Sequence, residues 1–271
     1  MTIQLKQFAP SSGAIYYFSG TGNTAFVAHE FQENYKAINV PVDLFSIETI
    51  DVVSSQGKYD FLMIGFPTYA FCPPDIVADF VKKLPEVKDK PVILFSTGGA
   101  SAGTSFNTLE KILIKKHYIV LSNFFYVMPD NVYFVYGKDI DKDERIDLLI
   151  TTTKEKVKQD FDQLMSSKAR FVKANVFLSL ISPQAKFFFF KFFKKKWVWD
   201  RKECDFCGLC AKLCPTKNIS VKKEKGKVSF SNNCMFCTRC YNFCPKKAIH
   251  YKSIKKTKNL RRYTRLKDEI L

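Results

Sequence analysis

Two stretches of this 271-residue chain repeat one pattern: CDFCGLCAKLCP at residues 204–215 and CMFCTRCYNFCP at residues 234–245. Each stretch has four cysteines spaced C-x2-C-x2-C-x3-C and a proline after the last one. The correspondence extends beyond the cysteines to three further pairs: Phe206 and Phe236, Lys217 and Lys247, and Ile219 and Ile249. An internal duplication, offset by thirty residues, is the simplest description.

Eight cysteines at this spacing are the ligand set of two 4Fe–4S clusters. Three closely spaced cysteines bind one cluster, and the fourth, turned away before its proline, binds the other. The pattern therefore predicts one cluster held by Cys204, Cys207, Cys210 and Cys244. It predicts a second cluster held by Cys234, Cys237, Cys240 and Cys214.

Zinc and disulfides are the alternatives for these cysteines. Structural zinc sites usually combine two C-x2-C pairs or include histidine, and three evenly spaced cysteines suit one tetrahedral ion poorly. The three histidines, His29, His117 and His250, lie outside both stretches, and we interpret them as ordinary core or surface residues. We therefore favour iron–sulfur clusters over zinc, and zinc over disulfides.

The start of the chain and its hydropathy predict a cytoplasmic protein. Residues 1–18 lack the basic region, the uninterrupted apolar run and the cleavage site of a signal peptide. No stretch reaches the roughly 18 apolar residues that a spanning helix needs. Because the cytoplasm keeps thiols reduced, nine cysteines there indicate metal or redox chemistry rather than disulfides.

Charge divides the chain into two parts. Residues 1–150 contain 13 Lys and Arg and 17 Asp and Glu, whereas residues 151–271 contain 30 and 9. The formal net charge of +17 therefore comes entirely from the second half. Since hydrophobic residues make up 46% of the chain, we expect packed domains rather than disorder.

The first half alternates predicted strands and helices. Helical patterns follow residues 26–35, 108–116 and 141–166, with apolar residues on one face. Short apolar runs predict five strands, at residues 13–18, 40–45, 60–66, 91–96 and 118–128. This alternation predicts an α/β fold with a doubly wound, five-stranded parallel sheet, whose ligands bind at the carboxyl ends of the strands.

The loop SGTGNT, at residues 19–24, follows the first predicted strand. Its two glycines let the backbone approach a ligand closely, and the next helix begins with unpaired amides that favour an anion. The hydroxyls of Ser19, Thr21 and Thr24 add donors, as a terminal phosphate requires.

Two alternatives exist for this loop. Residues 20–25 also fit the dinucleotide pattern G-x-G-x-x-A, and Asp43 lies at about the right distance in the sequence for a ribose contact, so NAD(P) is one alternative. A purely structural glycine-rich turn is the other.

Three motifs after the first, third and fourth strands, YYFSGTGNT, GFPTYAF and STGGASAG, resemble those of flavodoxins over residues 10–166. This resemblance implies FMN, with its phosphate in the first loop and its ring between the other two. The implied phosphate loop is Ser19, Gly20, Thr21, Gly22, Asn23 and Thr24. The implied ring-binding residues are Pro67, Thr68, Tyr69, Ala70, Thr97, Gly98, Gly99 and Ala100.

The third motif departs from the flavodoxin pattern because it contains no aromatic residue to stack on the flavin. Tyr69 or Phe71 could stack from the other side, and the second domain could cover the outer face of the ring. Neighbouring Cys72 is interpreted as a small buried residue rather than a nucleophile.

Residues 200–251 resemble bacterial two-cluster ferredoxins, and the whole chain resembles flavodoxin–ferredoxin fusion proteins. We therefore expect a flavodoxin-like FMN domain and a small α+β ferredoxin-like domain, in which KKEKGK forms a hairpin turn. The predicted divisions are the FMN domain at 1–166, an aromatic and basic linker at 167–200, the two-cluster domain at 201–252 and a basic tail at 253–271.

The basic second half predicts an acidic redox protein as partner, by electrostatic steering. Contact of the aromatic, basic linker with a membrane surface is an alternative, and nucleic acid is disfavoured because no recognition motif is present. The resemblance implies low-potential electron transfer between FMN and two 4Fe–4S clusters in anaerobic metabolism. Two other functions stay open: a flavin-dependent reductase of a small molecule, and an iron–sulfur sensor that binds nucleic acid or a membrane.

Overall fold

The computed structural model describes most of the chain outside the predicted linker. The described residues are 8–50, 58–136, 145–168, 170–172, 184, 187, 188, 191, 192 and 196–264, without the side chain of Ile254. Most of the linker predicted at 167–200, the first residues of the helical pattern at 141–166 and the end of the tail lie outside them.

A five-stranded parallel sheet forms the centre of the larger domain. Its strands run in the order β2-β1-β3-β4-β5, which is the flavodoxin-like order for a doubly wound sheet. The strands are β1 Gly13–Tyr17, β2 Val42–Ser46, β3 Phe61–Pro67, β4 Lys90–Gly98 and β5 Tyr118–Val127. All five predicted strands are confirmed, and the predicted fold class with them.

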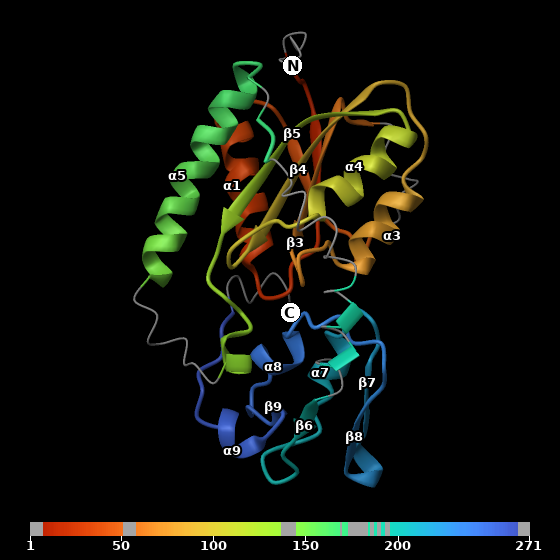
Figure 1. The fold of residues 1–271 in the computed structure, drawn as a ribbon, viewed down its shortest axis with the longest axis vertical. Coiled ribbons are helices and arrows are strands. Elements are labelled where there is room, and N and C mark those ends of the chain that lie inside the picture. The colour runs from red at the N-terminus through yellow and green to blue at the C-terminus, as the bar shows by residue number, and fades with distance from the viewer. Residues whose placement is uncertain are drawn as a thin grey trace.

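Helices cover both faces of this sheet (Figure 1). Helices α1 Asn23–Ala37 and α5 Ile146–Met165 pack against one face, and α3 Asp75–Lys83 and α4 Ser105–Lys115 against the other. The nine residues of α3 were not predicted, because the sequence between the third and fourth strands was interpreted only as far as its first loop.

Successive side chains along each strand point to opposite faces of the sheet, and apolar residues on both faces form two cores. Tyr16 belongs to the core beneath α3 and α4, whereas its neighbour Ile15 belongs to the core beneath α1 and α5. At the centre of the sheet, Phe95 of β4 packs directly over Gly65 of β3. A Cβ atom at Gly65 would lie 2.1 Å from the Phe95 ring, so the ring needs a glycine there.

The smaller domain consists of short elements around the cysteine stretches. Strands β6 Trp197–Trp199 and β9 Ile249–Tyr251 form one antiparallel pair, and β7 Ile219–Lys222 and β8 Lys227–Phe230 form another. The predicted hairpin turn is confirmed, with a 3-10 turn η4 at Lys223–Lys225 and Gly226 in the left-handed region at φ 52°. Since β6 pairs with β9, the small domain begins before residue 201.

The internal duplication is visible in the backbone. Helix α7 Leu209–Lys212 and helix α8 Arg239–Asn242 start thirty residues apart. Positive φ angles recur at the same spacing, at Phe206 and Phe236 (58° and 61°), Gly208 and Thr238 (79° and 63°), and Lys217 and Lys247 (51° and 52°). Both stretches therefore fold into the same loop, which supports the predicted repeat.

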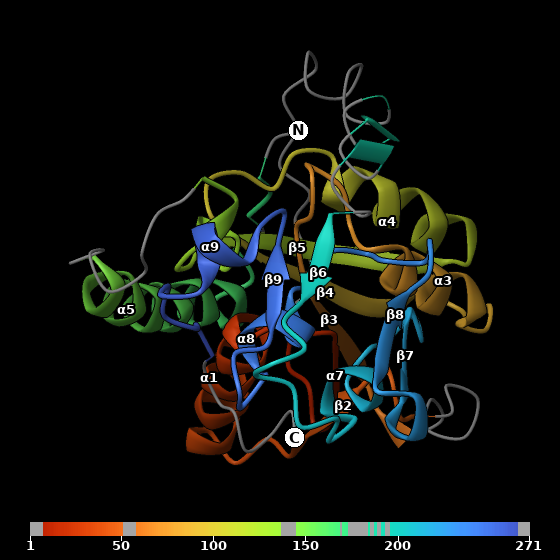
Figure 2. The ribbon, with the colours of Figure 1, turned by 90° about the horizontal axis from the view of Figure 1, so that it is seen from below.

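The small domain lies across the carboxyl ends of the sheet strands (Figures 1 and 2). Met235 and Cys237 from the second cysteine stretch are buried in the same core as the residues beneath α3 and α4. Tyr133 and Phe134, in the 3-10 turn η2 Tyr133–Tyr136 after β5, join Trp197, Tyr241 and Tyr251 in an aromatic cluster. The two domains are thus joined by a shared apolar interior.

The described part of the basic tail folds back onto this junction. After the short helix α9 Ile254–Thr257, the guanidinium of Arg262 stacks on the Tyr241 ring at 3.4 Å. The Tyr263 hydroxyl donates a hydrogen bond of 2.6 Å to Asn23 in the first loop of the larger domain. These tail residues are therefore structural parts of the domain junction.

The contact between Gly65 and Phe95 gives a stability prediction. We expect Gly65→Ala to lower the stability of the sheet domain by about 1–3 kcal/mol, because the added methyl group overpacks a closed core. Gly99→Ala is the matched control, since its Cβ would meet only Asp130, at 3.9 Å. Thermal unfolding by circular dichroism without oxygen measures both variants, and equal midpoints would contradict the proposed packing.

Candidate functional site

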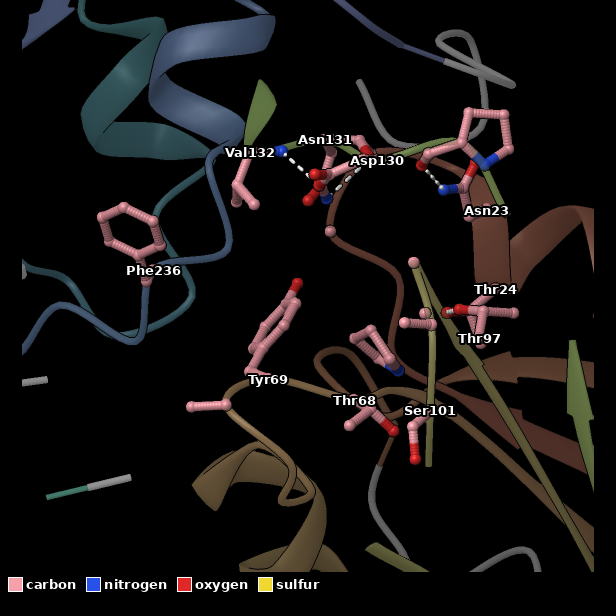
Figure 3. A pocket seen from close by; sticks show the side chains of 18 of the residues that line it. Asn23, Thr24, Thr68, Tyr69, Thr97, Ser101, Asp130, Asn131, Val132 and Phe236 are labelled. Atoms are coloured by element: carbon pink, nitrogen blue, oxygen red, sulfur yellow. Dashed lines mark hydrogen bonds between the residues drawn. The ribbon is translucent and has the colours of Figure 1, made fainter. Parts of the chain in front are cut away.

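A cavity of about 550 Å³ opens at the carboxyl ends of β1, β3 and β4, where the three predicted loops meet (Figure 3). Gly22 is the one predicted flavin-loop residue that does not line it. The predicted residues that do are Ser19, Gly20, Thr21, Asn23, Thr24, Pro67, Thr68, Tyr69, Ala70, Thr97, Gly98, Gly99 and Ala100. The structure therefore gathers residues from three separate parts of the sequence around one space.

The first loop leads directly into α1. Gly22 precedes the helix with φ 103°, and its amide donates to the Ser19 hydroxyl at 3.1 Å. Among the described residues, no side chain caps this end of α1. The amides of its first turn therefore stay available to an anion, and Asn23 and Thr24 of this turn line the cavity. The buried hydroxyl of Thr21 accepts from Asn131 at 3.0 Å, and that of Thr24 pairs with Thr97 at 2.8 Å. Glycine backbone and hydroxyls thus form a cradle that fits a phosphate.

The loop after β3 makes a tight turn beside this cradle. Tyr69 and Cys72 pair through both backbone hydrogen bonds, and the two residues between them, Ala70 and Phe71, have φ angles of 48° and 64°. Thr68 anchors the loop, because its hydroxyl bonds to Ser96 at 2.8 Å. Cys72 is buried as predicted, with its sulfur 3.6 Å from the Thr104 hydroxyl.

Tyr69 and Phe71, the two predicted stacking candidates, both line the cavity. Phe71 is 40% exposed, whereas the Tyr69 hydroxyl is buried and has no hydrogen-bond partner among the described residues. Burial raises the pKa of Tyr69 well above its usual value, and the neighbouring Cys237 contributes in the same direction. Tyr69 therefore stays protonated, with a donor available to a bound ligand.

Residues that the sequence analysis missed complete the cavity. Asp130, Asn131 and Val132 follow β5, and Phe236 comes from the second cysteine stretch of the small domain (Figure 3). Asp130–Val132 could have been found, because β5 ends at the same edge as the other strands. Phe236 gave no signal, since nothing local in the sequence tells which part of the small domain would reach the sheet.

The NAD(P) alternative finds no support in the geometry. Asp43, its expected ribose contact, is on β2 and accepts a hydrogen bond of 2.6 Å from the Tyr59 hydroxyl. Asp43 is not among the described residues that line the cavity.

One of the three histidines, His250, is a core residue, as the sequence predicts. Its ring nitrogen lies 3.0 Å from the Thr257 hydroxyl, and burial lowers the pKa of His250 to about 4.

The cysteines separate into two groups of four. Cys204, Cys207, Cys210 and Cys244 line a second, small cavity, and we call them the far set. Burial is the main cause of the raised pKa of Cys240, and the charges of Cys237, Cys234, Cys210 and Cys214 add to it. Cys234 and Cys214 also raise the pKa of Cys237, and we call these two, Cys237 and Cys240 the near set. Because Cys210 of the far set acts on Cys240 as well, the two sets lie next to each other. In each set the fourth cysteine comes from the other stretch, as in the crossed arrangement predicted from the sequence. The structure thus brings all eight predicted cysteines together in two groups, while their role as ligands stays a prediction.

The near set adjoins the large cavity, and the far set reaches the surface. Cys237 is buried between the domains, whereas Cys207 is exposed. Backbone amides donate to the two crossing cysteines in equivalent ways, from Asn218 to Cys214 and from Ala248 to Cys244, both at 3.2 Å. Such amides stabilise a thiolate, which is the form that binds iron.

Burial opposes ionisation of these thiols. It raises the pKa of Cys210 and of Cys237 to about 12, and neighbouring cysteines of each set add to the rise. Four adjacent thiolates therefore need a compensating positive charge, which bound iron supplies. Among the described residues, no group of three or more His, Cys, Asp or Glu is arranged to hold a metal ion, so iron on these cysteines stays a prediction. A donor set made only of cysteine sulfur fits iron–sulfur clusters.

Comparison with protein families gives a match for the smaller domain. Residues 196–253 match the family described as 4Fe-4S dicluster domain. No curated protein matches the chain. Among the described residues, none of the helices is both long and apolar enough to cross a membrane.

Three similar solved structures each cover little more than half of this chain. Oxidised flavodoxin 2 from Bacillus cereus is 17% identical, with a TM-score of 0.42 over 57% of this chain and 98% of that one. Megasphaera elsdenii flavodoxin is 24% identical, with a TM-score of 0.39 over 54% and 98%. Rubredoxin:oxygen oxidoreductase from Desulfovibrio gigas is 17% identical, with a TM-score of 0.42 over 60% and 38%.

The strand order and the matched family describe different parts of one chain. The sheet has the flavodoxin-like order, and the cysteine stretches lie within the matched segment. The chain therefore joins a flavodoxin-like domain to a 4Fe–4S dicluster domain, as its resemblance to flavodoxin–ferredoxin fusion proteins implies.

Proposed function

We propose that this protein is an electron carrier of low-potential anaerobic metabolism, with FMN in the large cavity and one 4Fe–4S cluster on each cysteine set. FMN supplies a centre that takes up two electrons and releases them singly, and each cluster supplies a one-electron centre. The observation that carries this proposal is that the cavity and the near set share a wall.

Four residues form this shared wall: Phe236, Cys237, Gly20 and Tyr69. Phe236 lines the cavity, and the next residue along the chain, Cys237, belongs to the near set. A Cβ atom on Gly20 would lie only 2.9 Å from the Cys237 carbonyl oxygen, so the two backbones are in contact. The Tyr69 hydroxyl lies beside the same Cβ position, and Tyr69 also lines the cavity, so this side chain stands between the two sites. Groups held in these two sites would be neighbours, as single-electron exchange requires.

The cavity residues bind and orient rather than react. The first loop and the start of α1 would hold the phosphate, and the loops after β3 and β4 would flank the ring. Tyr69 and Phe236 form an apolar boundary toward the near set, which excludes water from that side. No general acid or base is nominated, because a carrier of electrons needs spacing and burial rather than proton transfer.

The cofactor content tests this function first. We expect oxygen-free protein to contain one FMN and about eight irons per chain. Cys244→Ala removes a crossing ligand of the far set and should lower the iron to about four while FMN stays bound. Cys72→Ala, which changes a buried cysteine outside both sets, should keep all the iron. Zinc in place of iron, or iron without flavin, would refute the proposal.

The phosphate loop can be tested separately. Thr21→Val keeps the side-chain shape but removes a hydroxyl from the cradle, and we expect the Kd for FMN to rise about tenfold or more. The Kd for riboflavin, which lacks the phosphate, should change little. Thr108→Val is the matched control, because its hydroxyl bonds only within α4, to the Thr104 carbonyl. Flavin fluorescence measures all these values, and equal losses for both ligands would show that this loop does not hold the phosphate.

We further propose that an acidic redox protein docks beside the far set. Cys207 is exposed there, and Lys222, Lys223 and Lys225 of the adjacent hairpin are exposed as well. The hairpin lies beside the far set, since a Cβ on Gly226 would come within 3.8 Å of the Phe206 ring. A basic surface around an exposed ligand would attract an acidic partner to the point where electrons leave or enter.

Charge reversal tests this docking surface. We expect the triple change of Lys222, Lys223 and Lys225 to Glu to slow electron exchange with an acidic two-cluster ferredoxin about tenfold at low salt. The difference should vanish at high salt, because ions screen exposed charges. Reversal of Lys83, Lys111 and Lys115, which are exposed on α3 and α4, is the control. Stopped-flow absorbance gives the rates, and similar slowing by both triple variants would argue against a local surface.

A further inference from the structure

Arg239 of the small domain reaches into the phosphate loop of the larger one. It stands between Cys237 and Cys240 of the near set, at the start of α8. Its guanidinium donates to the Ser19 carbonyl at 2.7 Å and to the Gly20 carbonyl at 3.2 Å. The side chain is only 7% exposed, so these contacts lie inside the domain junction.

Every N–H group of this guanidinium has an acceptor. Besides the two loop carbonyls, both oxygens of Glu48 accept from it, and so does the Leu213 carbonyl, at 3.3 Å. The cation also lies 5.1 Å from the centre of the Phe18 ring. Five donors with five acceptors match the planar fork of arginine, which lysine cannot reproduce. The pocket is therefore built for this one side chain.

The internal duplication provides a comparison within the same chain. The position equivalent to Arg239 in the first stretch is Leu209, which lines the far cavity. The equivalent of buried Met235 is exposed Asp205. Both stretches fold alike, and among the described residues the second contributes Met235 and Cys237 to the core of the sheet. The cysteine loop can therefore form without an arginine at this position. We attribute Arg239 instead to the contact that its stretch makes with the phosphate loop.

The two hydrogen bonds from Arg239 to the loop carbonyls also orient the amides of the phosphate cradle. In a planar trans peptide the carbonyl and the amide of one peptide unit point in opposite directions. Because Arg239 holds the carbonyls of Ser19 and Gly20, the amides of Gly20 and Thr21 are turned away from it, and both residues line the cavity.

We propose that Arg239 is a positioning residue through which the cluster domain organises the phosphate loop, so that FMN binding and seating of the near set are coupled. This inference rests on the proposed function, because it takes FMN as the ligand of the cavity. Coupling of this kind is reciprocal: the seated cluster domain strengthens FMN binding, and bound FMN strengthens the seating by the same factor.

Flavin titrations of the full chain test this coupling. With iron and sulfide content confirmed, flavin-depleted protein is titrated with FMN and with riboflavin, and flavin fluorescence gives both Kd values. We expect Arg239→Gln to raise the Kd for FMN about tenfold or more and to leave that for riboflavin within about threefold. Arg201→Gln is the matched control, since this exposed arginine of the small domain lies beside Gly226 in the hairpin turn and does not line the cavity.

A second variant tests the coupling even if Arg239→Gln fails to retain its iron–sulfur clusters. Glu48→Ala lies outside the cysteine stretches and removes the carboxylate that orients the guanidinium. It should raise the Kd for FMN about threefold or more without a matching change for riboflavin. The coupling is refuted if FMN affinity is unchanged in a variant that keeps its clusters, or if both ligands weaken equally. Absence of FMN binding by the unaltered protein would instead refute the proposed function.

Discussion

The burial of the second cysteine stretch against the carboxyl edge of the sheet determines the rest of this structure. Met235 and Cys237 share an apolar core with strand residues, and Arg239 forms a fully partnered buried cation beside them. Breaking such a junction would expose apolar surface and leave a charge without its partners, both of which are costly. The relative position of the two domains is therefore fixed by core packing and buried hydrogen bonds across their junction.

Much of the fold followed from local patterns. Apolar runs and the loops after them predict the five strands and thirteen cavity residues, because each signal lies within a few neighbouring residues and the parallel topology brings strand ends together. Helix α3 was missed, although its apolar residues Val77, Phe80 and Val81 are buried on one face. The residues after β5 were missed because no glycine-rich motif marks them.

The domain junction could not be predicted in this way. Contacts between Arg239 and Ser19 or Gly20 span more than two hundred positions in the sequence, and no periodicity records them. The two cysteine stretches also look interchangeable from their spacing. The differences that distinguish them, Met235 for Asp205 and Arg239 for Leu209, become meaningful only when the structure shows which stretch meets the sheet.

The same asymmetry gives the two cysteine sets different surroundings. The near set is enclosed by the domain junction, with Cys237 buried and a guanidinium beside it, whereas the far set has an exposed cysteine and solvent-facing lysines. Charge on a buried group is stabilised chiefly by fixed partners, while charge on an exposed group is stabilised by water and screened by salt. The two copies of the motif therefore differ in what stabilises their charge. For the second copy it is fixed groups at the junction with the flavodoxin-like domain, and for the first it is solvent and any partner that binds there.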